Sequence, residues 1–252
     1  MKETIETART KKQKGVFLEY LHALTIAILA ALILRAFVVQ AFRIPTGSMK
    51  DTLLVGDFLL VNKFVYGVRT PDRLLGTNIE IPHVRLPAFR KPQRGDIIIF
   101  KFPNDTSIDY IKRCVGLPGD TIQVRSNTVF VNGEPEGEEQ FLDQKFDPEE
   151  QATFQYYRIH TSQDLEYTIR KRLKKPARVQ NYGPVVVPPD HLFMMGDNRD
   201  NSSDSRFWGF MPMEHVVGRA LIIYFSFDKH KWKSAWNIFE AVRWQRLLNF
   251  IR

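Results

Sequence analysis

The feature that most constrains this chain is a long apolar run near its N-terminus. Residues 16–42 are mostly aliphatic or aromatic, and residues 21–34 contain no Asp, Glu, Lys or Arg. A membrane-spanning helix needs about 20 apolar residues, and long side chains at its ends can reach the interface. We therefore expect a single transmembrane helix over residues 16–41.

Two other structures suit such a run, namely a buried core helix and a cleavable signal peptide. No small-x-small cleavage pattern follows the run before Pro45, which weakens the second alternative. The tip, residues 1–15, carries five Lys and Arg against two Glu. Positive charge favours the cytoplasmic side, so we expect residues 1–15 in the cytoplasm and the chain after the helix outside.

Composition limits the partners of the remaining chain. A length of 252 residues with 44% hydrophobic residues is ample for a folded domain. The net charge of +8 comes with basic residues interleaved among apolar ones at both ends. This favours an anionic lipid surface as partner, and we expect no nucleic acid. The basic tail of residues 229–252 suits a helix in the lipid interface or packing on the domain equally well.

Residues 42–228 are expected to form an all-β, antiparallel domain, because alternating or β-branched runs recur between turn signals. The predicted strands are residues 56–66, 95–102, 108–115, 121–125, 128–131, 154–159, 166–169, 185–187, 192–195 and 216–227. A proline-rich loop is expected at residues 68–92, and Asn132-Gly133 is a strong hairpin signal.

Two charge runs point to an inserted β-rich subdomain over about residues 134–183. Residues 134–150 contain eight acidic residues, and a basic run covers residues 170–178. We interpret both runs as solvated faces of the insertion. The one cysteine, Cys114, excludes an internal disulfide, and its apolar neighbours favour a buried thiol over a nucleophile.

A Pro-Thr-Gly-Ser-Met turn follows the apolar run and places Ser48 where the chain changes direction. A serine nucleophile needs a base for its hydroxyl proton, and the six histidines stand in no recognisable catalytic motif. Thr46 and Lys50 occupy the glycine positions of a Gly-x-Ser-x-Gly elbow. A Ser-His-Asp triad is therefore disfavoured.

Lysine can replace histidine if burial lowers its pKa toward neutrality. Lys112 shares a predicted strand face with Tyr110 and Cys114, which would bury part of it. The alternative is an edge-strand lysine that reaches water.

A third candidate is the loop Gly196-Asp-Asn-Arg-Asp-Asn-Ser-Ser-Asp-Ser-Arg206, whose side chains can brace its backbone. A plain structural turn network is one alternative. A calcium loop is another, although Arg199 stands where an EF-hand needs an oxygen ligand.

The segments PTGSM with KDTL, RGDIIIF, YIKRCVGLPGD and GDNRDNSSDSRFWG follow one another after the apolar run. Over about residues 42–226, with the apolar run, the chain resembles the bacterial type I signal peptidases, or leader peptidases. The resemblance implies a membrane serine endopeptidase that removes signal peptides from secreted preproteins, with Ser48 as nucleophile, Lys112 as general base and no metal or cofactor. It places the catalytic domain outside the bacterial cytoplasmic membrane, with preproteins, the phospholipid bilayer and the secretion translocon as partners.

The resemblance also assigns supporting roles. Thr46 would form an oxyanion site with the Ser48 N–H, Ser202 would orient the lysine, and Asp204 with Arg206 would brace the loop. Small side chains at substrate positions −1 and −3 would bind in pockets lined by Phe42, Ile44, Pro45, Met49, Leu53, Ile99, Tyr110 and Ile111. Around Lys112 the resemblance places Tyr110, Phe100, Met194 and Ser203.

Two other functions fit the same residues. One is a membrane-anchored β-domain that binds partners through its charged insertion and has no catalytic activity. The other is a Ser-His hydrolase acting on lipids, which would lose activity when a histidine is replaced.

Overall fold

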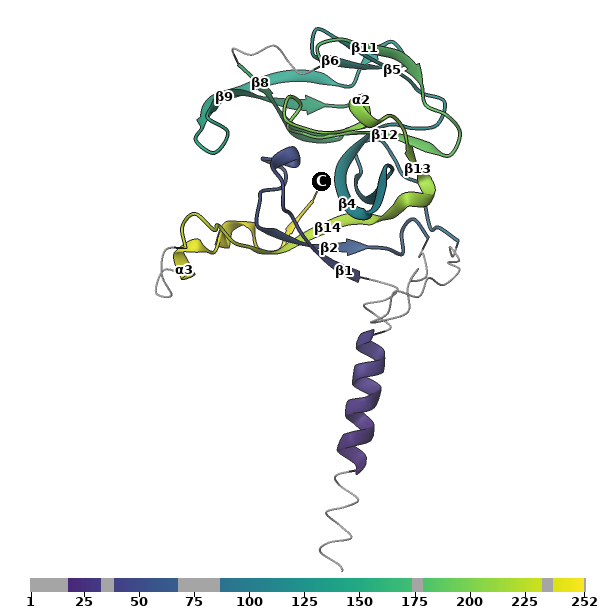
Figure 1. Ribbon diagram of the computed structural model, residues 1–252, viewed down its shortest axis with the longest axis vertical. Helices are drawn as coiled ribbons and strands as arrows, with labels where there is room; N and C mark the ends of the chain where they lie inside the picture. Colours follow the sequence, from purple (N-terminus) through teal and green to yellow (C-terminus); the bar gives the residue numbers. More distant parts are fainter. Residues whose placement is uncertain (1–17, 33–38, 68–86, 174–178, 233–237, 252) are drawn as a thin grey trace, which may run out of the picture.

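The computed structural model describes residues 18–32, 39–67, 87–173, 179–232 and 238–251 (Figure 1). Antiparallel strands in three sheets dominate these residues, and outside the helix of residues 18–32 the helices are few and short. The predicted all-β class of the domain is thus confirmed. The strands are β1 (Val39–Arg43), β2 (Asp57–Asn62), β3 (Ile97–Phe102), β4 (Asp105–Gly116), β5 (Thr121–Arg125), β6 (Thr128–Val131), β7 (Glu134–Pro135), β8 (Glu138–Asp147), β9 (Ala152–His160), β10 (Glu166–Arg172), β11 (Tyr182–Val186), β12 (His191–Met195), β13 (Met211–Pro212), β14 (Val216–Ser226) and β15 (Asn249–Phe250).

The central sheet has the strand order β1-β2-β14-β3-β4-β12-β13, and β15 pairs with β14 outside this path. Consecutive side chains of β3 enter different apolar clusters, because they point to opposite faces of the sheet. Ile99 packs with Leu59 and Val61 on one face, whereas Ile98 and Phe100 belong to the cluster on the other. Since both faces are covered, β3 is an almost continuous apolar run.

Two smaller sheets lie on the opposite side of the domain from β1 and β2 (Figure 1). One has the order β11-β5-β6-β7 and the other β10-β9-β8. The second is the core of the predicted insertion and spans residues 138–172. Residues at the ends of the predicted 134–183 range belong to β7 and β11, and so to the other sheet.

Several strand predictions agree with the structure in detail. The bounds of β5 and β6 are those predicted, and the Asn132-Gly133 turn joins β6 to β7. Five strands were not predicted: the two-residue strands β7, β13 and β15, and the longer strands β1 and β8. The first three residues of β1, 39–41, were assigned to the transmembrane helix, because an apolar run suits either structure until pairing with β2 selects the strand. β8 lies in the acidic run and is specified by pairing with β9 rather than by an apolar face.

Residues 18–32 are helical, and every one of them is exposed. Within the described ranges, no helix combines the length and the apolar character that crossing a membrane requires. Part of the predicted helix, residues 16–17 and 33–38, lies outside the described residues, and so does most of the predicted loop, residues 68–86.

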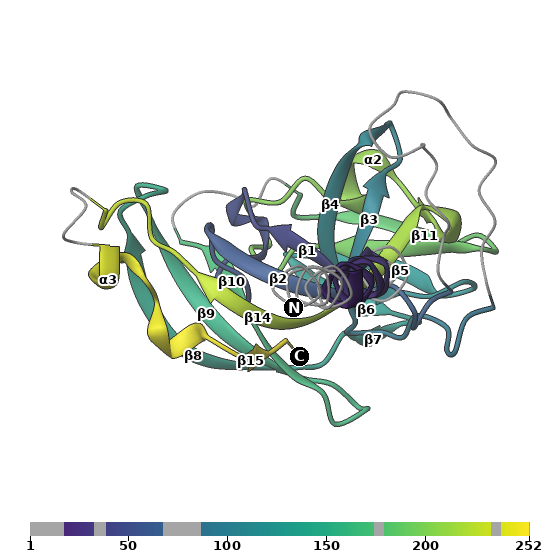
Figure 2. The same ribbon diagram turned by 90° about the horizontal axis from the view of Figure 1, so that it is seen from below.

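The C-terminal tail docks on the central sheet. Figure 2 shows it beside β14, on the face from which the helix of residues 18–32 projects. Its elements are α3 (Ile238–Ala241), η4 (Trp244–Arg246) and β15. Arg246 pairs with Asp57 of β2 at 2.6 Å, and Ile251 is buried in the core. Of the two predicted placements, packing on the domain is therefore present.

Candidate active site

The serine turn, residues 44–53, connects β1 to β2. Its apolar side chains Ile44, Met49 and Leu53 are almost fully buried in the central core. The Leu53 N–H donates to the Met49 carbonyl at 2.7 Å. These anchors hold the backbone on both sides of Ser48, which lies in the single-turn 3₁₀ helix η1 (Gly47–Met49) and is 8% exposed.

Lys112 reaches Ser48 from β4, an interior strand paired with β3 and β12. Its Nζ lies 2.7 Å from the Ser48 Oγ and 2.9 Å from the Ile111 carbonyl oxygen. The Tyr110 ring centre is 5.1 Å from the same nitrogen. Because the Lys112 side chain is only 4% exposed, the alternative of an edge-strand lysine in water is wrong.

Burial sets the protonation state of Lys112. Removing the ammonium from water lowers the pKa of Lys112 to about 8, although the negative charges of Asp204 and Asp197 oppose part of the effect. As an ammonium, Nζ donates to the Ser48 Oγ; as a neutral amine, it can accept the hydroxyl proton. The pair can therefore transfer a proton near neutral pH.

Asp197 ties the bracing loop, residues 196–206, to both halves of the site. Arg113, next to Lys112 on β4, donates from Nε and Nη2 to the two carboxylate oxygens of Asp197 at 2.8 and 2.7 Å. The Thr52 Oγ1 of the serine turn donates to Asp197 Oδ2 at 2.6 Å. A bidentate pair with no exposed surface fixes both distance and orientation.

Asp204 and Arg206 form the second pair of the loop. Arg206 donates from Nε and Nη2 to the Asp204 carboxylate, each at 2.8 Å, and the Gly196 N–H donates to it at 3.1 Å. Burial alone would raise the pKa of Asp204, but the bonds from Arg206 and Gly196 hold it below its usual value. Asp204 also caps the short helix α2 (Ser205–Trp208).

Of three residues to which the resemblance gives supporting places, Ser202 is buried, whereas Ser203 and Thr46 are exposed. Ser202 is buried, yet its Oγ has no hydrogen bond of normal geometry to any described residue, Lys112 included. It lies near enough to the Asp204 carboxylate to help lower the pKa of that group. Ser203 is exposed. Thr46 is also exposed and precedes η1 without capping it.

Most of the predicted substrate-binding residues share one apolar cluster beside the serine. The cluster contains Ile44, Met49, Leu53, Ile99 and Ile111, with Phe42 packed against it. Tyr110 lies in the neighbouring cluster with Phe100 and Met194, and Pro45 is exposed.

Arg170 and Asp147 lie in the two charge runs that the sequence analysis interpreted as solvated faces. Arg170, in the basic run, is fully buried, and Asp147, in the acidic run, is 7% exposed. The prediction that both runs are solvated faces is therefore wrong at these positions. A buried arginine is recognisable only from the carboxylates around it, and its partners here are remote in sequence.

The carboxylates of the bracing loop are occupied by protein groups. Asp197 is held by Arg113, Asp204 by Arg206, and Asp200 accepts from the Arg172 N–H at 2.7 Å. The calcium-loop alternative is thereby disfavoured. Among the described residues, no three His, Cys, Asp or Glu side chains are grouped to hold a metal ion.

Comparison with known proteins places the chain in a family. A sequence model described as signal peptidase, peptidase S26, matches residues 17–225. This chain belongs to the signal peptidase family. The peptidase is thus a hydrolase, and the alternative of a β-domain without catalytic activity is removed.

Named relatives agree over most of the peptidase. Signal peptidase I of Pseudomonas aeruginosa is 38% identical over 232 residues, which cover 87% of this chain and 76% of the relative. Signal peptidase I of Aquifex aeolicus is 36% identical over 237 residues, covering 81% and 82% respectively. A crystal structure of a signal peptidase I from Enterococcus faecalis V583 is 27% identical, with a TM-score of 0.32, and covers 52% of this chain and 98% of that one. That structural likeness is too loose to carry an argument.

Proposed function

We propose that this peptidase removes signal peptides from secretory preproteins with a catalytic dyad of Ser48 and Lys112. The observation that carries the proposal is the 2.7 Å separation of Ser48 Oγ from a buried Lys112 Nζ, whose pKa is lowered to about 8. Family membership supports the substrate class, since the named relatives are signal peptidases.

The dyad would work in two halves. The neutral amine of Lys112 takes the hydroxyl proton as Ser48 Oγ attacks the scissile carbonyl carbon. The ammonium then returns that proton to the leaving amine, which breaks the peptide bond and leaves an acyl ester on Ser48. In the second half, Lys112 accepts a proton from water, whose oxygen attacks the ester carbonyl carbon. The ammonium then returns that proton to Ser48 Oγ as the ester bond breaks, which releases the new carboxyl terminus and regenerates Ser48.

The oxyanion formed in each half needs hydrogen-bond donors. Ser48 lies in the first turn of η1, where backbone N–H groups lack partners within the helix, so its N–H is one candidate. Thr46 supplies the second, because its hydroxyl is not used as a cap and precedes Ser48 by two residues.

Selection of small substrate side chains follows from the apolar cluster beside Ser48. Ile44, Met49, Leu53 and Ile111 are tightly buried together, with Pro45 exposed beside them. Such a floor offers shallow room at position −1, and Phe42 with Ile99 would limit position −3. Tyr110 would border the lysine side.

A membrane location is part of the proposal. The helix of residues 18–32 exposes large apolar side chains, among them Leu21, Leu24 and Ile28. A helix that is apolar all round is stable in lipid or in a protein core, and this one is exposed. We infer a single-pass anchor in the bacterial cytoplasmic membrane with a cytoplasmic N-terminus and the domain on the outer side, where preproteins leave the translocon.

The test uses the full chain in detergent micelles and a preprotein with Ala at −3 and −1. Ser48→Ala and Lys112→Ala should each lower cleavage about 1,000-fold or more, because each removes a group that reacts. Ser203→Ala and Lys101→Ala are matched controls, since Ser203 is exposed and Lys101 pairs with Asp109 at the surface. Processing by Ser48→Ala at the rate of the controls would refute the proposal. A lipase-like Ser-His enzyme would instead hydrolyse lipid esters and lose that activity with a histidine variant.

A further inference from the structure

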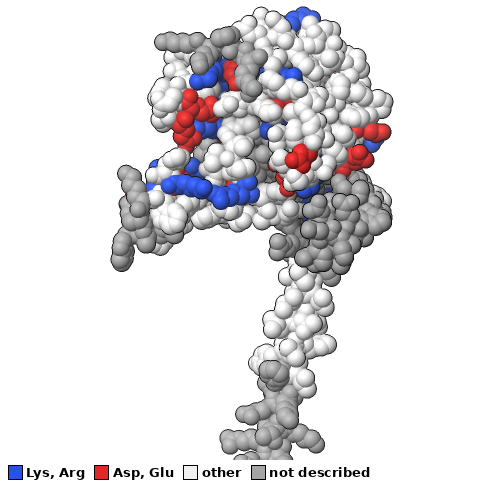
Figure 3. All heavy atoms as spheres, in the orientation of Figure 1, with Lys and Arg blue, Asp and Glu red and all other residues white. Residues whose placement is uncertain are grey.

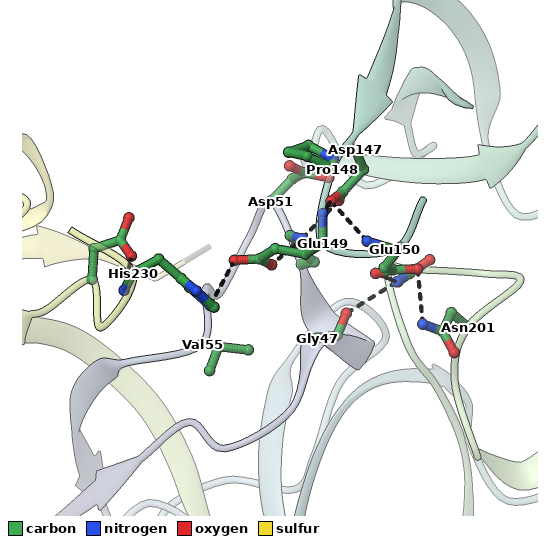
Figure 4. Close-up of polar contacts among 12 residues, drawn as sticks. Gly47, Asp51, Val55, Asp147, Pro148, Glu149, Glu150, Asn201 and His230 are labelled. Carbon is green, nitrogen blue, oxygen red and sulfur yellow. Dashed lines mark hydrogen bonds and ion pairs between the residues drawn. The ribbon is translucent and has the colours of Figure 1, made fainter. Parts of the chain in front are cut away.

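The turn between β8 and β9, residues 147–151, contacts the serine turn directly (Figure 4). The Lys50 Nζ, two residues after Ser48, lies 2.6 Å from Asp147 Oδ2 and 2.6 Å from Glu149 Oε2. This acidic turn belongs to the insertion, between its strands β8 and β9. A contact of this kind gives the insertion a route to the nucleophile.

Arg170 of β10 fixes the shape of the acidic turn from inside. Its guanidinium has no exposed surface and donates from Nη1 to Asp147 Oδ2 at 2.7 Å and from Nη2 to Glu150 Oε1. The Phe154 ring centre lies 4.2 Å from the guanidinium carbon. Burial alone would raise the pKa of Asp147, but bonds from Lys50 and Arg170 hold it at about 2. A buried cation with ionised partners tolerates little displacement of them.

Glu150 connects the acidic turn to the backbone at Gly47 and Ser48 through hydrogen bonds to the bracing loop. Its carboxylate accepts from the Asn198 Nδ2 at 3.1 Å and from the Asn201 Nδ2 at 2.8 Å, and Figure 4 shows the turn over Gly47. Asn198 in turn donates from Nδ2 to the Gly47 carbonyl at 3.1 Å and from its backbone N–H to the Ser48 carbonyl at 3.1 Å. Glu150 thus holds the side-chain amide of Asn198, a residue that binds the Gly47 carbonyl through that amide and the Ser48 carbonyl through its backbone N–H.

Backbone hydrogen bonds connect β10, the strand of Arg170, to the bracing loop. The Arg170 N–H donates to the Asp197 carbonyl at 3.0 Å, and the Arg199 N–H donates to the Arg170 carbonyl at 3.1 Å. Residues 197–199 are therefore held by β10 on one side and by Glu150 on the other. Asn198, whose N–H donates to the Ser48 carbonyl, lies between these two contacts.

We propose that Glu150 and Arg170 are positioning residues for the peptidase reaction, acting through Asn198 on the backbone at Ser48. This inference rests on the proposed role of Ser48 as the nucleophile. Neither residue contacts the reacting atoms. Reacting groups must meet within narrow limits, and a misplacement of about 1 Å can cost about 100-fold in rate.

The experiment measures single-turnover cleavage, with the full-length enzyme in micelles in saturating excess over a preprotein bearing Ala at −3 and −1. Under these conditions the rate constant does not depend on how many enzyme molecules are folded. Glu150→Ala should lower it about 100-fold, with the half-saturating enzyme concentration changed less than about threefold. Glu150→Gln keeps an acceptor oxygen for Asn198 and should recover most of the loss.

The matched control is Glu139→Ala. Glu139 pairs with Lys171 at 2.6 Å in the same sheet, so this variant removes a similar ion pair and leaves the contacts of Asn198 intact. Its rate constant should stay within about twofold of wild type. The inference is overturned if Glu139→Ala and Glu150→Ala lower the single-turnover rate constant equally, or if Glu150→Ala keeps the wild-type rate constant.

A double variant tests the route through Asn198. Asn198→Ala alone and Glu150→Ala/Asn198→Ala together should be equally slow, because removal of the Asn198 amide already breaks the link from Glu150 to the Gly47 carbonyl. If the double variant instead loses the product of the two single losses in rate constant, Glu150 and Asn198 act independently, which contradicts the inference. Ser48→Ala is measured in parallel: if it cleaves, the proposed function has failed, whereas a dead Ser48→Ala beside an unaffected Glu150→Ala refutes only the positioning role.

Discussion

At the scale of single residues, the chemistry depends on Lys112. Burial favours the neutral amine, while the ionised Asp204 and Asp197 favour the ammonium, and the pKa of Lys112 settles at about 8. These carboxylates do not neutralise the effect of burial because each is already paired with its own arginine. The result is a lysine that is stably protonated at rest yet easily deprotonated.

The pH dependence of cleavage should report this balance. Activity requires the neutral amine, so the single-turnover rate constant should rise with pH and reach half its maximum near pH 8, where Lys112 is half deprotonated. At pH 7 about a tenth of the maximum is expected. The measurement is a pH profile of wild-type cleavage, and a midpoint close to the ordinary lysine value would contradict a buried base.

The same burial should lower the free energy of unfolding while Lys112 is protonated. The unfolded chain binds a proton at Lys112 up to about pH 10.5, the folded chain only up to about pH 8, so stability rises with pH between these values. Below pH 8, Lys112→Met should therefore raise the free energy of unfolding by about 3 kcal/mol, the equivalent of that difference in pKa.

Denaturant unfolding of wild type and Lys112→Met, each in the same micelles at pH 7 and at pH 10.5, tests this. The advantage of the variant should shrink toward zero at the higher pH, because wild-type Lys112 is then neutral. An advantage that is the same at both values would show that shape, rather than charge, is responsible.

At the scale of elements, the bracing loop and the serine turn touch without space between them. A Cβ added at Gly196 would lie 2.3 Å from the Ser202 Oγ and 2.5 Å from the Ser48 carbonyl oxygen. No side chain fits there, so two segments separated widely in sequence approach at this glycine. The geometry of the dyad depends on that approach.

Gly196→Ala should therefore push the serine turn away from Lys112. We expect cleavage to fall about 100-fold and the free energy of unfolding to fall by about 1–3 kcal/mol, as for overpacking. Gly119→Ala is the control: its φ of +87° makes alanine strained, but a Cβ there meets nothing within 4 Å. It should lose stability with little loss of activity, and equal losses of activity would argue against a local effect at Ser48.

At the scale of the whole molecule, one face of the domain carries exposed aromatic and basic side chains, and the proposed membrane anchor would bring this face to the lipid surface. A hollow of about 860 Å³ beside the tail is lined by Arg43, Phe58, Trp232, Phe239 and Trp244, with others. Figure 3 shows a row of Lys and Arg across the lower part of the domain, the side on which the tail and the helix of residues 18–32 lie. Exposed aromatic and basic side chains together suit an anionic interface.

Trp232→Ser with Trp244→Ser should slow cleavage of a preprotein embedded in anionic vesicles by about tenfold or more, because each exposed Trp loses apolar burial worth over 1 kcal/mol. Cleavage of a short peptide in micelles should be unchanged. Phe141→Ser with Phe146→Ser, exposed on β8, is the control and should affect neither. If the phenylalanine variant slowed cleavage in vesicles as much as the tryptophan variant, the effect would not be specific to this face.

The fold was predictable where one segment carries its own pattern. β5 and β6 alternate between turn residues, so their bounds could be read from the sequence. β1 could not be separated from the helix before it, because both are apolar, and β8 has no buried face to produce a pattern. Pairing partners decided both strands.

For the site, the chain by itself indicated the serine turn and the strand that carries Lys112, and the family resemblance added the pair Asp204 and Arg206. Only the tertiary structure decided that Arg113 and Arg170 are buried and that the insertion reaches the nucleophile through Glu150. The physical reason is that a charged side chain looks the same in sequence whether it faces water or a carboxylate. Burial of an arginine is favourable only where remote segments bring carboxylates to it, and folding alone creates that environment.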